Sequence, residues 1–413
     1  MSRAWLIVLG AFLFLPSAAW PQGPVGPEFR VNTYTGGDQQ RASVATDAAG
    51  NFVVVWDGPG DGVGPGIFGQ RFSIAGIPLG PEFRVNTYTT GMQTNPSVAS
   101  DASGNFVVVW TSEGQDGTGD GVFGQRYDAS GGALGPEFRV TTNTNDDQRW
   151  PAVAMDSSGS FVVVWGDYFP SFPPDVFGQR FDSSGSPLGT AFRVNSSTGF
   201  GAFLPKVATD SLGHFVVAWT GGFVPICCNI AGQRFASTGA TLGPQFQINT
   251  SSGYPANPDI AVDASGNFVV VWNTNDVFSG NTGDVFGQRF ASNGMPLGLE
   301  FQVATSPYDQ YEARVGSDAA GNFVVVWRSS GQDGSSNGIF GQRYSSDGAP
   351  LGTEFRVNTY TTNNQRLADV AADPVGNVVV VWESQGQDGA ENGVFGQRWR
   401  PIVPVELMRF AVE

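Results

Sequence analysis

The stretch Gly50-Asn51-Phe52-Val53-Val54-Val55-Trp56 carries the pattern that decides the fold. The segment 51–56 is too short for a typical buried helix, and its β-branched valines favour a strand. Its apolar side chains follow one another without alternation, and successive side chains of a strand point to opposite faces. We therefore predict a strand that is covered on both faces.

The tryptophan that closes this stretch recurs seven times, at intervals of 53 to 55 residues. An aspartate before a turn, a Gly-Gln-Arg triplet and a phenylalanine that opens a strand keep the same phase. The tryptophans are Trp56, Trp110, Trp165, Trp219, Trp272, Trp327 and Trp382, and the aspartates are Asp47, Asp101, Asp156, Asp210, Asp263, Asp318 and Asp373. A sustained internal period of this kind indicates a repeat architecture.

Each unit contains four short apolar or alternating segments, which in the first unit are 29–32, 43–46, 51–56 and 67–72. A period of about fifty residues with four antiparallel strands is typical of a β-propeller, in which twisted sheets pack face to face around an axis. We predict an all-β fold, a seven-bladed β-propeller of four-stranded antiparallel blades. The tryptophans then belong to the core.

The order of strands within a blade follows from side-chain size. The segment of small residues fits the crowded centre, followed outward by the tryptophan strand, the Gly-Gln-Arg strand and the Phe-Arg-Val-Asn strand. On this order the last blade, 369–399, lacks an outer strand, and the strand at 29–32 should complete it and close the ring. An open solenoid is the competing architecture, and it would need capping units that the two ends do not show.

With the segments Gly50–Trp56 and Phe68-Gly69-Gln70-Arg71-Phe72 in view, the chain resembles a group of secreted bacterial seven-repeat proteins of β-propeller type. The resemblance covers roughly residues 27–400. It implies the fold and export from the cell, and it implies no particular reaction. The segment 404–410 also resembles a short segment near the ends of some exported bacterial proteins, although a plain C-terminal tail is the simpler interpretation.

The N-terminus has the order of a secretory signal peptide, with Arg3, an apolar run at 4–15 and small residues at 17–19. We predict a signal peptide at 1–19, a linker at 20–26, the propeller at 27–400 and a tail at 401–413. The mature protein is then secreted, either extracellular or periplasmic. Cys227 and Cys228 would form a vicinal disulfide there or remain thiols.

The composition excludes several function classes. The net charge is −16 and the only lysine is Lys206, so phosphate backbones and anionic membranes are repelled. We expect no nucleic-acid partner, no membrane insertion and a monomer. One histidine, His214, and two cysteines leave almost no material for a histidine-based triad or a zinc site, and His214 takes the turn position of Asn51.

Variation between units is concentrated in the linkers that follow the outer strands and the tryptophan strands. Both sets of linkers emerge on one rim, here called the variable rim, and the aspartate turns emerge on the opposite turn rim. Loops on a rigid scaffold often carry function. The candidate ligand-binding residues are Trp150, Tyr168, Phe169, Phe172, Phe223, Tyr254 and Tyr308. The alternative is that these aromatics pack down between blades.

Two repeated polar features have structural alternatives. Asp116, Asp333 and Asp388 lie in Gln-Asp-Gly loops and are calcium candidates, although a calcium ion needs six to eight oxygen ligands and a polar turn is the simpler interpretation. Calcium is the one cofactor considered. The arginines of Gly-Gln-Arg are expected to pair with nearby carboxylates, for which the turn aspartates are the natural partners.

Three functions follow from these patterns. The first is a secreted, non-enzymatic binding or adhesion module that presents its variable aromatic loops to a glycan or a surface protein. The second is a hydrolase or lyase acting on polysaccharide with paired carboxylates, drawn from Asp146, Asp147, Asp167 and Asp175. The third is a structural cell-surface repeat protein. No catalytic residue is assigned.

Overall fold

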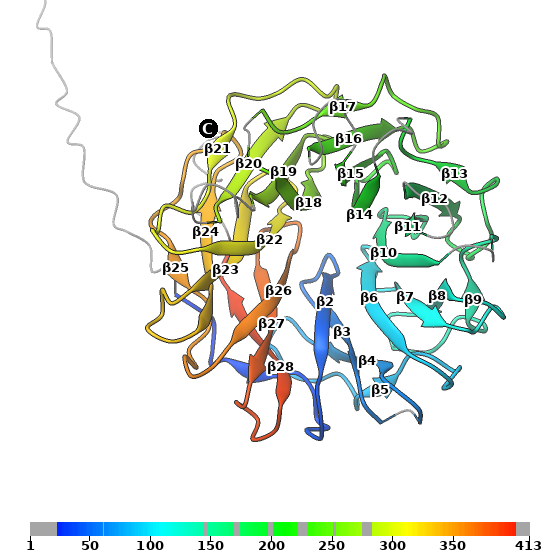
Figure 1. The fold of residues 1–413 in the computed structure, drawn as a ribbon, viewed down its shortest axis with the longest axis horizontal. Helices are drawn as coiled ribbons and strands as arrows, with labels where there is room; N and C mark the ends of the chain where they lie inside the picture. The colour runs from blue at the N-terminus through cyan, green and yellow to red at the C-terminus, as the bar shows by residue number, and fades with distance from the viewer. Residues whose placement is uncertain are drawn as a thin grey trace, which may run out of the picture.

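A computed structural model of the chain describes residues 23–60, 62–143, 147–168, 174–196, 201–221, 229–250, 253–274 and 283–401. Seven four-stranded antiparallel sheets stand around a central axis, as the blades of a β-propeller (Figure 1). The described ranges contain no helix, and hence none that could cross a membrane. The predicted fold class is confirmed, including the number of blades.

The strands are given blade by blade, from the axis outward. Blades 1 to 4 are β2 (Gln40–Thr46), β3 (Phe52–Gly58), β4 (Gly66–Phe72), β5 (Phe83–Arg84); β6 (Gln93–Ser100), β7 (Phe106–Glu113), β8 (Asp120–Tyr127), β9 (Phe138–Arg139); β10 (Gln148–Met155), β11 (Phe161–Asp167), β12 (Asp175–Phe181), β13 (Phe192–Arg193); and β14 (Ala202–Thr209), β15 (Phe215–Gly221), β16 (Ile230–Phe235), β17 (Phe246–Gln247). Blades 5 to 7 are β18 (Pro255–Val262), β19 (Phe268–Thr274), β20 (Val285–Phe290), β21 (Phe301–Gln302); β22 (Gln310–Ser317), β23 (Phe323–Ser330), β24 (Asn337–Tyr344), β25 (Phe355–Arg356); and β26 (Gln365–Ala372), β27 (Val378–Gln385), β28 (Asn392–Trp399) with β1 (Phe29–Arg30) outermost.

The ring closes as predicted, because β1 pairs antiparallel with β28 and completes blade 7. The closure extends beyond the strand itself: the Val25 N–H donates to the Arg398 carbonyl at 2.7 Å, and the Val31 N–H donates to the Val394 carbonyl at 2.8 Å. The two ends of the propeller are therefore joined by backbone hydrogen bonds, and β28 has a strand on its outer side, as the third strand of every other blade does.

The tryptophan strand packs on both neighbouring blades. Val53 and Val55 belong to a core cluster with Trp110 of blade 2, whereas Phe52 and Val54 belong to a cluster with valines of β27 in blade 7. All seven tryptophans of these strands are at most 3% exposed. Burial of about 200 Å² per tryptophan contributes roughly 5 kcal/mol each as an upper bound, which makes this layer the main source of stability.

The aspartate turns are held by their own side chains. Asp47 Oδ1 accepts the N–H groups of Ala49 and Asn51, each at 2.9 Å, and Asp47 Oδ2 accepts Asn51 Nδ2 at 2.9 Å. Gly50 closes the turn with φ of +78°, and a Cβ there would lie 2.7 Å from the side chain of Ile74. His214 replaces the asparagine in blade 4, and its Nδ1 lies 2.9 Å from Asp210 Oδ2, in agreement with the predicted turn role.

The arginines of Gly-Gln-Arg have a different partner from the one predicted. Arg234 donates to the carbonyls of Ser292, in the outer turn of the next blade, at 2.6 Å and of Leu242 at 2.7 Å. Arg71, Arg126, Arg180, Arg289 and Arg398 donate to the corresponding turn of the following blade. The predicted pairing with turn aspartates is wrong, because those carboxylates are already occupied by N–H groups of their own turns.

Arg343 is the exception among the seven. The corresponding outer turn of blade 7 would follow Trp399, where the chain runs instead into Arg400 and Pro401. Arg343 is 3% exposed, its Nε and Nη2 atoms have no hydrogen-bond partner among the described residues, and burial lowers its pKa to about 10. Its guanidinium lies 5.6 Å from the ring of Phe355. A buried guanidinium with unpaired donors is costly.

This difference predicts opposite effects for one substitution at equivalent sites. Arg234→Met should lower the free energy of unfolding by about 1–2 kcal/mol, because it removes charge-assisted hydrogen bonds between blades. Arg343→Met should leave it unchanged or raise it by about 1 kcal/mol, because unpaired donors are replaced by an apolar side chain. Urea unfolding of both variants measures this. An equal loss for both variants would contradict this prediction.

Candidate functional site

All seven innermost strands bend at the same position near the variable rim. In each, the register with the second strand shifts, as between the pairs Gln40–Asp57 and Ser43–Val55 in blade 1. The residue at the bend has φ between +48° and +57°, although none is a glycine. These residues form the bulge ring, which is Arg41, Asn95, Trp150, Leu204, Asn257, Glu312 and Leu367. Bulges re-aim side chains and are frequent at barrel rims.

The left-handed conformation is costly for most of these side chains. Asparagine tolerates it, whereas tryptophan and leucine lose about 1–2 kcal/mol each. Such strain persists only where the surrounding structure enforces it, and it often marks functional positions. Proline follows the bend in blades 2 to 5, where it needs no ladder partner. The bend is therefore a consistent feature of the ring rather than an irregularity of one blade.

A cavity of about 250 Å³ lies among the innermost strands, which surround the axis in Figure 1. Six members of the bulge ring, all except Glu312, line it. Next along the strands comes a second level, the inner ring, which consists of Ser43, Ser97, Ala152, Lys206, Asp259, Arg314 and Asp369. All of these except Ala152 and Asp259 are among the residues that line the cavity. The sequence predicted small residues here, and blades 4 to 7 instead carry alternating charges.

The inner ring joins neighbouring blades. Asp369 Oδ2 accepts the Val44 N–H at 2.9 Å, and Asp259 Oδ2 accepts the Val315 N–H at 2.9 Å. Ser97 Oγ accepts the Val153 N–H at 3.3 Å in the same way. The innermost strand is an edge strand, so these acceptors pair N–H groups that the ladder leaves open.

The charged members of the inner ring influence one another. Burial lowers the pKa of Lys206, with a further lowering by Arg314, while Asp259 and Asp369 oppose this shift. Burial raises the pKa of Asp259, which Lys206 and Arg314 oppose. All four side chains retain some contact with solvent, because the cavity is open to water. These four side chains are thus an electrostatically coupled group in the wall of the cavity.

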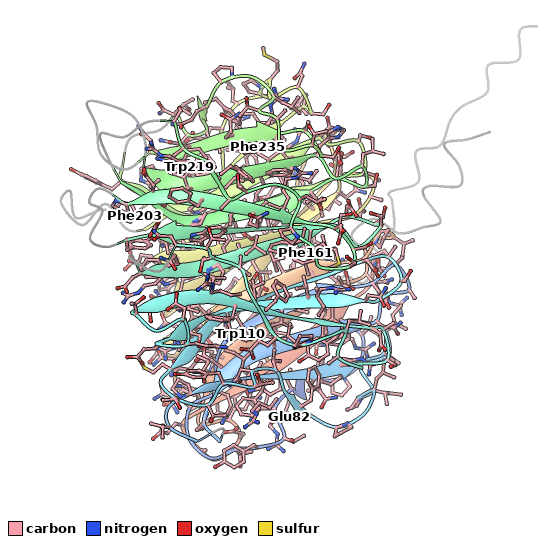
Figure 2. The ribbon with its side chains drawn as sticks, turned by 90° about the vertical axis from the view of Figure 1, so that its right-hand side faces the viewer. Glu82, Trp110, Phe161, Phe203, Trp219 and Phe235 are labelled. Atoms are coloured by element: carbon pink, nitrogen blue, oxygen red, sulfur yellow. The ribbon has the colours of Figure 1, made fainter. Side chains whose placement is uncertain are left out.

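An aromatic cluster lies where blades 3 and 4 meet the cavity. The rings of Trp150 and Tyr168 are 4.7 Å apart at 83°, and those of Tyr168 and Phe203 are 6.0 Å apart. Figure 2 shows the disc from its side, with Phe203 at one rim and Trp110 inside the blades. Tyr168 is half-buried, and burial raises its pKa. Tyr168 therefore supports Trp150, which lines the cavity.

Two further aromatic candidates, Tyr254 and Tyr308, lie in other blades. Tyr254 and Tyr308 are 42% and 44% exposed and lie before β18 and β22, in blades 5 and 6. Phe169, Phe172 and Phe223 lie outside the described residues, as do Cys227 and Cys228. Of the seven candidates, the structure brings together Trp150 and Tyr168.

The calcium candidates lie in loops that connect blades through hydrogen bonds. In blade 7, Gln387 donates to Glu28, whose other carboxylate oxygen accepts the Thr359 N–H of blade 6 at 2.7 Å. Asp388 Oδ2 accepts Asn32 Nδ2 at 3.3 Å, and its Oδ1 accepts the Ala390 N–H at 3.2 Å.

The loops of Asp116 and Asp333 in blades 2 and 6 repeat the link from glutamine to glutamate. In each of the three loops, the aspartate Oδ1 accepts a backbone N–H of the loop itself, as in a polar turn. Within the described ranges, no three side chains of His, Cys, Asp or Glu are grouped so that they could hold a metal ion.

Three of the acidic residues considered for catalysis, Asp147, Asp167 and Asp175, do not line the cavity. Asp147 is paired with Arg149 at 3.0 Å, and Asp175 is paired with Arg193 at 2.8 Å. Asp167 is buried and faces Asp175 across the ladder between β11 and β12. Asp146 lies outside the described residues. These side chains belong to the second and third strands of blade 3 or the linker before it.

Two other carboxylates, which sequence reasoning missed, are buried beside the bulge ring. Glu383 Oε1 accepts the Arg41 N–H at 2.7 Å, and Glu383 Oε2 is 3.0 Å from Arg366 Nε. Asp57 Oδ2 is 2.9 Å from Arg41 Nη1. Burial raises the pKa of Glu383 to about 7 and that of Asp57 to about 6, against the opposing effect of the arginines.

A sequence signal for this pair exists. Asp57 and Glu383 are the residues that directly follow the tryptophan in the first and the last unit. Ring closure makes those two units neighbours, so two acidic side chains at the ends of the repeat array meet around Arg41. The same alignment of units also places Lys206, Asp259 and Arg314 at one position of the innermost strand.

No protein-family model and no curated protein matches the chain. Many solved structures share its fold. A fungal alcohol oxidase of the AA5 family, in complex with copper, has a TM-score of 0.55 at 14% identity, over 91% of this chain and 76% of that chain. An α-L-arabinofuranosidase from Fusarium graminearum, in complex with an iminosugar inhibitor, has a TM-score of 0.50 at 9% identity, over 92% and 98%.

The β-propeller domain of the trilobed protease from Pyrococcus furiosus, which has an open velcro topology, has a TM-score of 0.51 at 9% identity, over 90% and 97%. At these identities the likeness shows the β-propeller fold alone. The present chain differs in topology from that domain's description, because β1 closes its ring.

The raised pKa of Glu383 predicts how stability depends on pH. The folded state holds the proton more tightly than the unfolded state, whose glutamate titrates near 4.5. The stabilising contribution is therefore complete below about pH 4.5 and is lost as the pH rises to about 7. In the Glu383→Gln variant, the loss of unfolding free energy over this pH range should be smaller by about 3 kcal/mol.

The measurement is the free energy of unfolding from urea titrations at pH 5 and pH 8. The exposed Glu391→Gln is the control, since it removes a carboxylate from the surface. A Glu383→Gln variant with the wild-type pH dependence would contradict the assignment of this decline to Glu383.

Proposed function

We propose that this chain is an exported, non-enzymatic binding module that takes a saccharide at the axial cavity of its variable rim. The observation that carries this proposal is that Trp150, held in a strained conformation and braced by Tyr168, lines a cavity shared with Asn95 and Asn257. An aromatic face beside amide groups suits a sugar ring, which has apolar faces and a polar edge.

The size and position of the cavity support this proposal. A volume of about 250 Å³ is near the lower end of small-molecule sites and would hold one or two sugar units. The cavity is formed by innermost strands of all seven blades, so its walls are part of the rigid core rather than of the linkers. The likeness in fold to an α-L-arabinofuranosidase does not distinguish binding from catalysis, because that neighbour is itself named as an enzyme.

The catalytic alternative is supported at the level of fold, by the likeness to an α-L-arabinofuranosidase, and not by the groups that line the cavity. Cleavage of a glycosidic bond by the usual mechanism needs two carboxyl groups about 5–10 Å apart on either side of the bond. The lining of the cavity includes one carboxylate, Asp369, and its Oδ2 accepts the Val44 N–H. Asp57 and Glu383 are buried and form ion pairs with Arg41 and Arg366, and Glu383 also accepts the Arg41 N–H.

The decisive test replaces Trp150 with the residue that other blades carry at the same position. Trp150→Asn should fold, because Asn95 and Asn257 already adopt the same positive φ in blades 2 and 5. Binding to the strongest ligand from a glycan array, measured by calorimetry, should fall about tenfold or more, because aromatic anchors dominate such sites.

Tyr34→Ala is the matched control, since Tyr34 is 54% exposed and does not line the cavity. It should bind as the wild type does. A blank array would contradict the proposal, as would a ligand whose affinity is unchanged by Trp150→Asn.

A further inference from the structure

Cationic side chains outside the repeated scaffold positions are concentrated at the axis. Thirteen of the described cations are the seven Gly-Gln-Arg arginines, the five Phe-Arg arginines and Arg400. Of the other six, five lie on innermost strands, and Arg328 lies on β23, the second strand of blade 6. They are Arg41, Arg149, Lys206, Arg314, Arg328 and Arg366. In a chain with a net charge of −16, this placement is not required by the fold.

Two of these cations have no ion-pair partner among the described residues. Arg41, Arg149, Arg328 and Arg366 are paired with carboxylates. Lys206 and Arg314 are in no such pair, and both line the axial cavity. The Lys206 side chain forms no hydrogen bond within the described ranges, and Arg314 donates to the carbonyl of its neighbour Ala313 at 2.9 Å.

The carboxylates of the inner ring are each partly used. Asp259 and Asp369 each accept a backbone N–H of the next blade through Oδ2. Lys206 and Arg314 add two cationic donor groups, an ammonium and a guanidinium, to the lining of the cavity. A ligand that complements it must bring acceptors, and charged acceptors form the strongest hydrogen bonds with such donors.

We propose that the saccharide taken by the axial cavity carries an acidic group, a carboxylate or a sulfate, which Lys206 and Arg314 bind. This inference rests on the proposed function, because the aromatic face of Trp150 holds the sugar ring. Asp259 lies between the two cations on blade 5, so the acidic group would sit nearer the axis than Asp259. Asp369, on the other side of Arg314, opposes anion binding.

The repeat supplies matched substitutions for the test, because Ser43 and Ser97 occupy the same ring position in blades 1 and 2. Lys206→Ser should fold, since serine at this position accepts the next blade's N–H in blade 2. Asp369→Ser retains such an acceptor for the Val44 N–H and removes a negative charge. The two variants should therefore change anion binding in opposite directions.

The probes are an oligogalacturonide, a neutral galacto-oligosaccharide of equal length, and inorganic sulfate. The oligogalacturonide should bind about tenfold more tightly than the neutral oligomer, and Lys206→Ser should reduce that ratio, because Arg314 alone then binds the acidic group. Asp369→Ser should raise the ratio. The exposed Tyr34→Ala, outside the cavity lining, should leave the ratio unchanged.

A second measurement uses the fact that Lys206 is the only lysine. Reductive methylation with ¹³C-formaldehyde gives one lysine signal in NMR spectra, which should shift on titration with the oligogalacturonide. A shift with sulfate at equal concentration would assign the site to acidic groups in general. A shift with sulfate and none with the oligogalacturonide would overturn the saccharide assignment.

Failure of this inference and failure of the proposed function give different results. Equal binding of acidic and neutral oligomers, sensitive to Trp150→Asn and insensitive to Lys206→Ser, would overturn the acidic-group inference alone. Binding of neither oligomer would overturn the proposed function, and an unmoved Lys206 signal in monomeric galacturonate would then overturn the inference as well.

Discussion

The face-to-face packing of the tryptophan strands is the constraint on which the rest of the structure depends. A strand such as β3 is apolar on both faces, so a single sheet cannot bury it. It needs a neighbour on each side, and that requirement is met for every blade only when the array returns to its start. Closure by β1 is therefore a consequence of the same packing that holds two consecutive blades together.

Closure also determines where charge can be placed. The outer surface is joined by repeated clamps, such as the Thr87 N–H that donates to Glu137 at 2.7 Å, and these positions are fixed by the repeat. The innermost strands are bounded by a small space instead of by another sheet, so their side chains can differ between blades. This is why Lys206, Asp259 and Arg314 occur at a position that serine and alanine fill elsewhere.

The sequence was sufficient for the fold because each element of the argument recurred seven times. A single apolar stretch such as Phe52–Trp56 could be a strand or part of a buried helix, and its sevenfold recurrence at a constant period removed this ambiguity. Strand order, ring closure and the roles of Asp47 and His214 followed from side-chain size and turn chemistry. The partner of the Gly-Gln-Arg arginines could not be predicted, because it is a backbone carbonyl of the next blade and every residue type has such a carbonyl.

The candidate site was harder to predict for a related reason. Sequence reasoning looked for variation in linkers and found Trp150 and Tyr168, but it treated the innermost strand as uniform because small residues fit there. The bend that turns Trp150, Leu204 and Asn257 towards the axis depends on backbone dihedral angles, which cannot be predicted from the type of a single residue.

Proline after the bend is the one local sign of it, and proline inside a strand is typical of bulges. Aligning the seven units residue by residue would have revealed the charged inner ring without coordinates. In such an alignment the scaffold positions carry the same residue in every unit, so a position that differs between units is easily seen. In a repeat protein, charged residues that depart from the repeat at a partly buried position are stronger candidates for function than residues that vary in exposed linkers. Partial burial of a charge has a cost that the fold does not require.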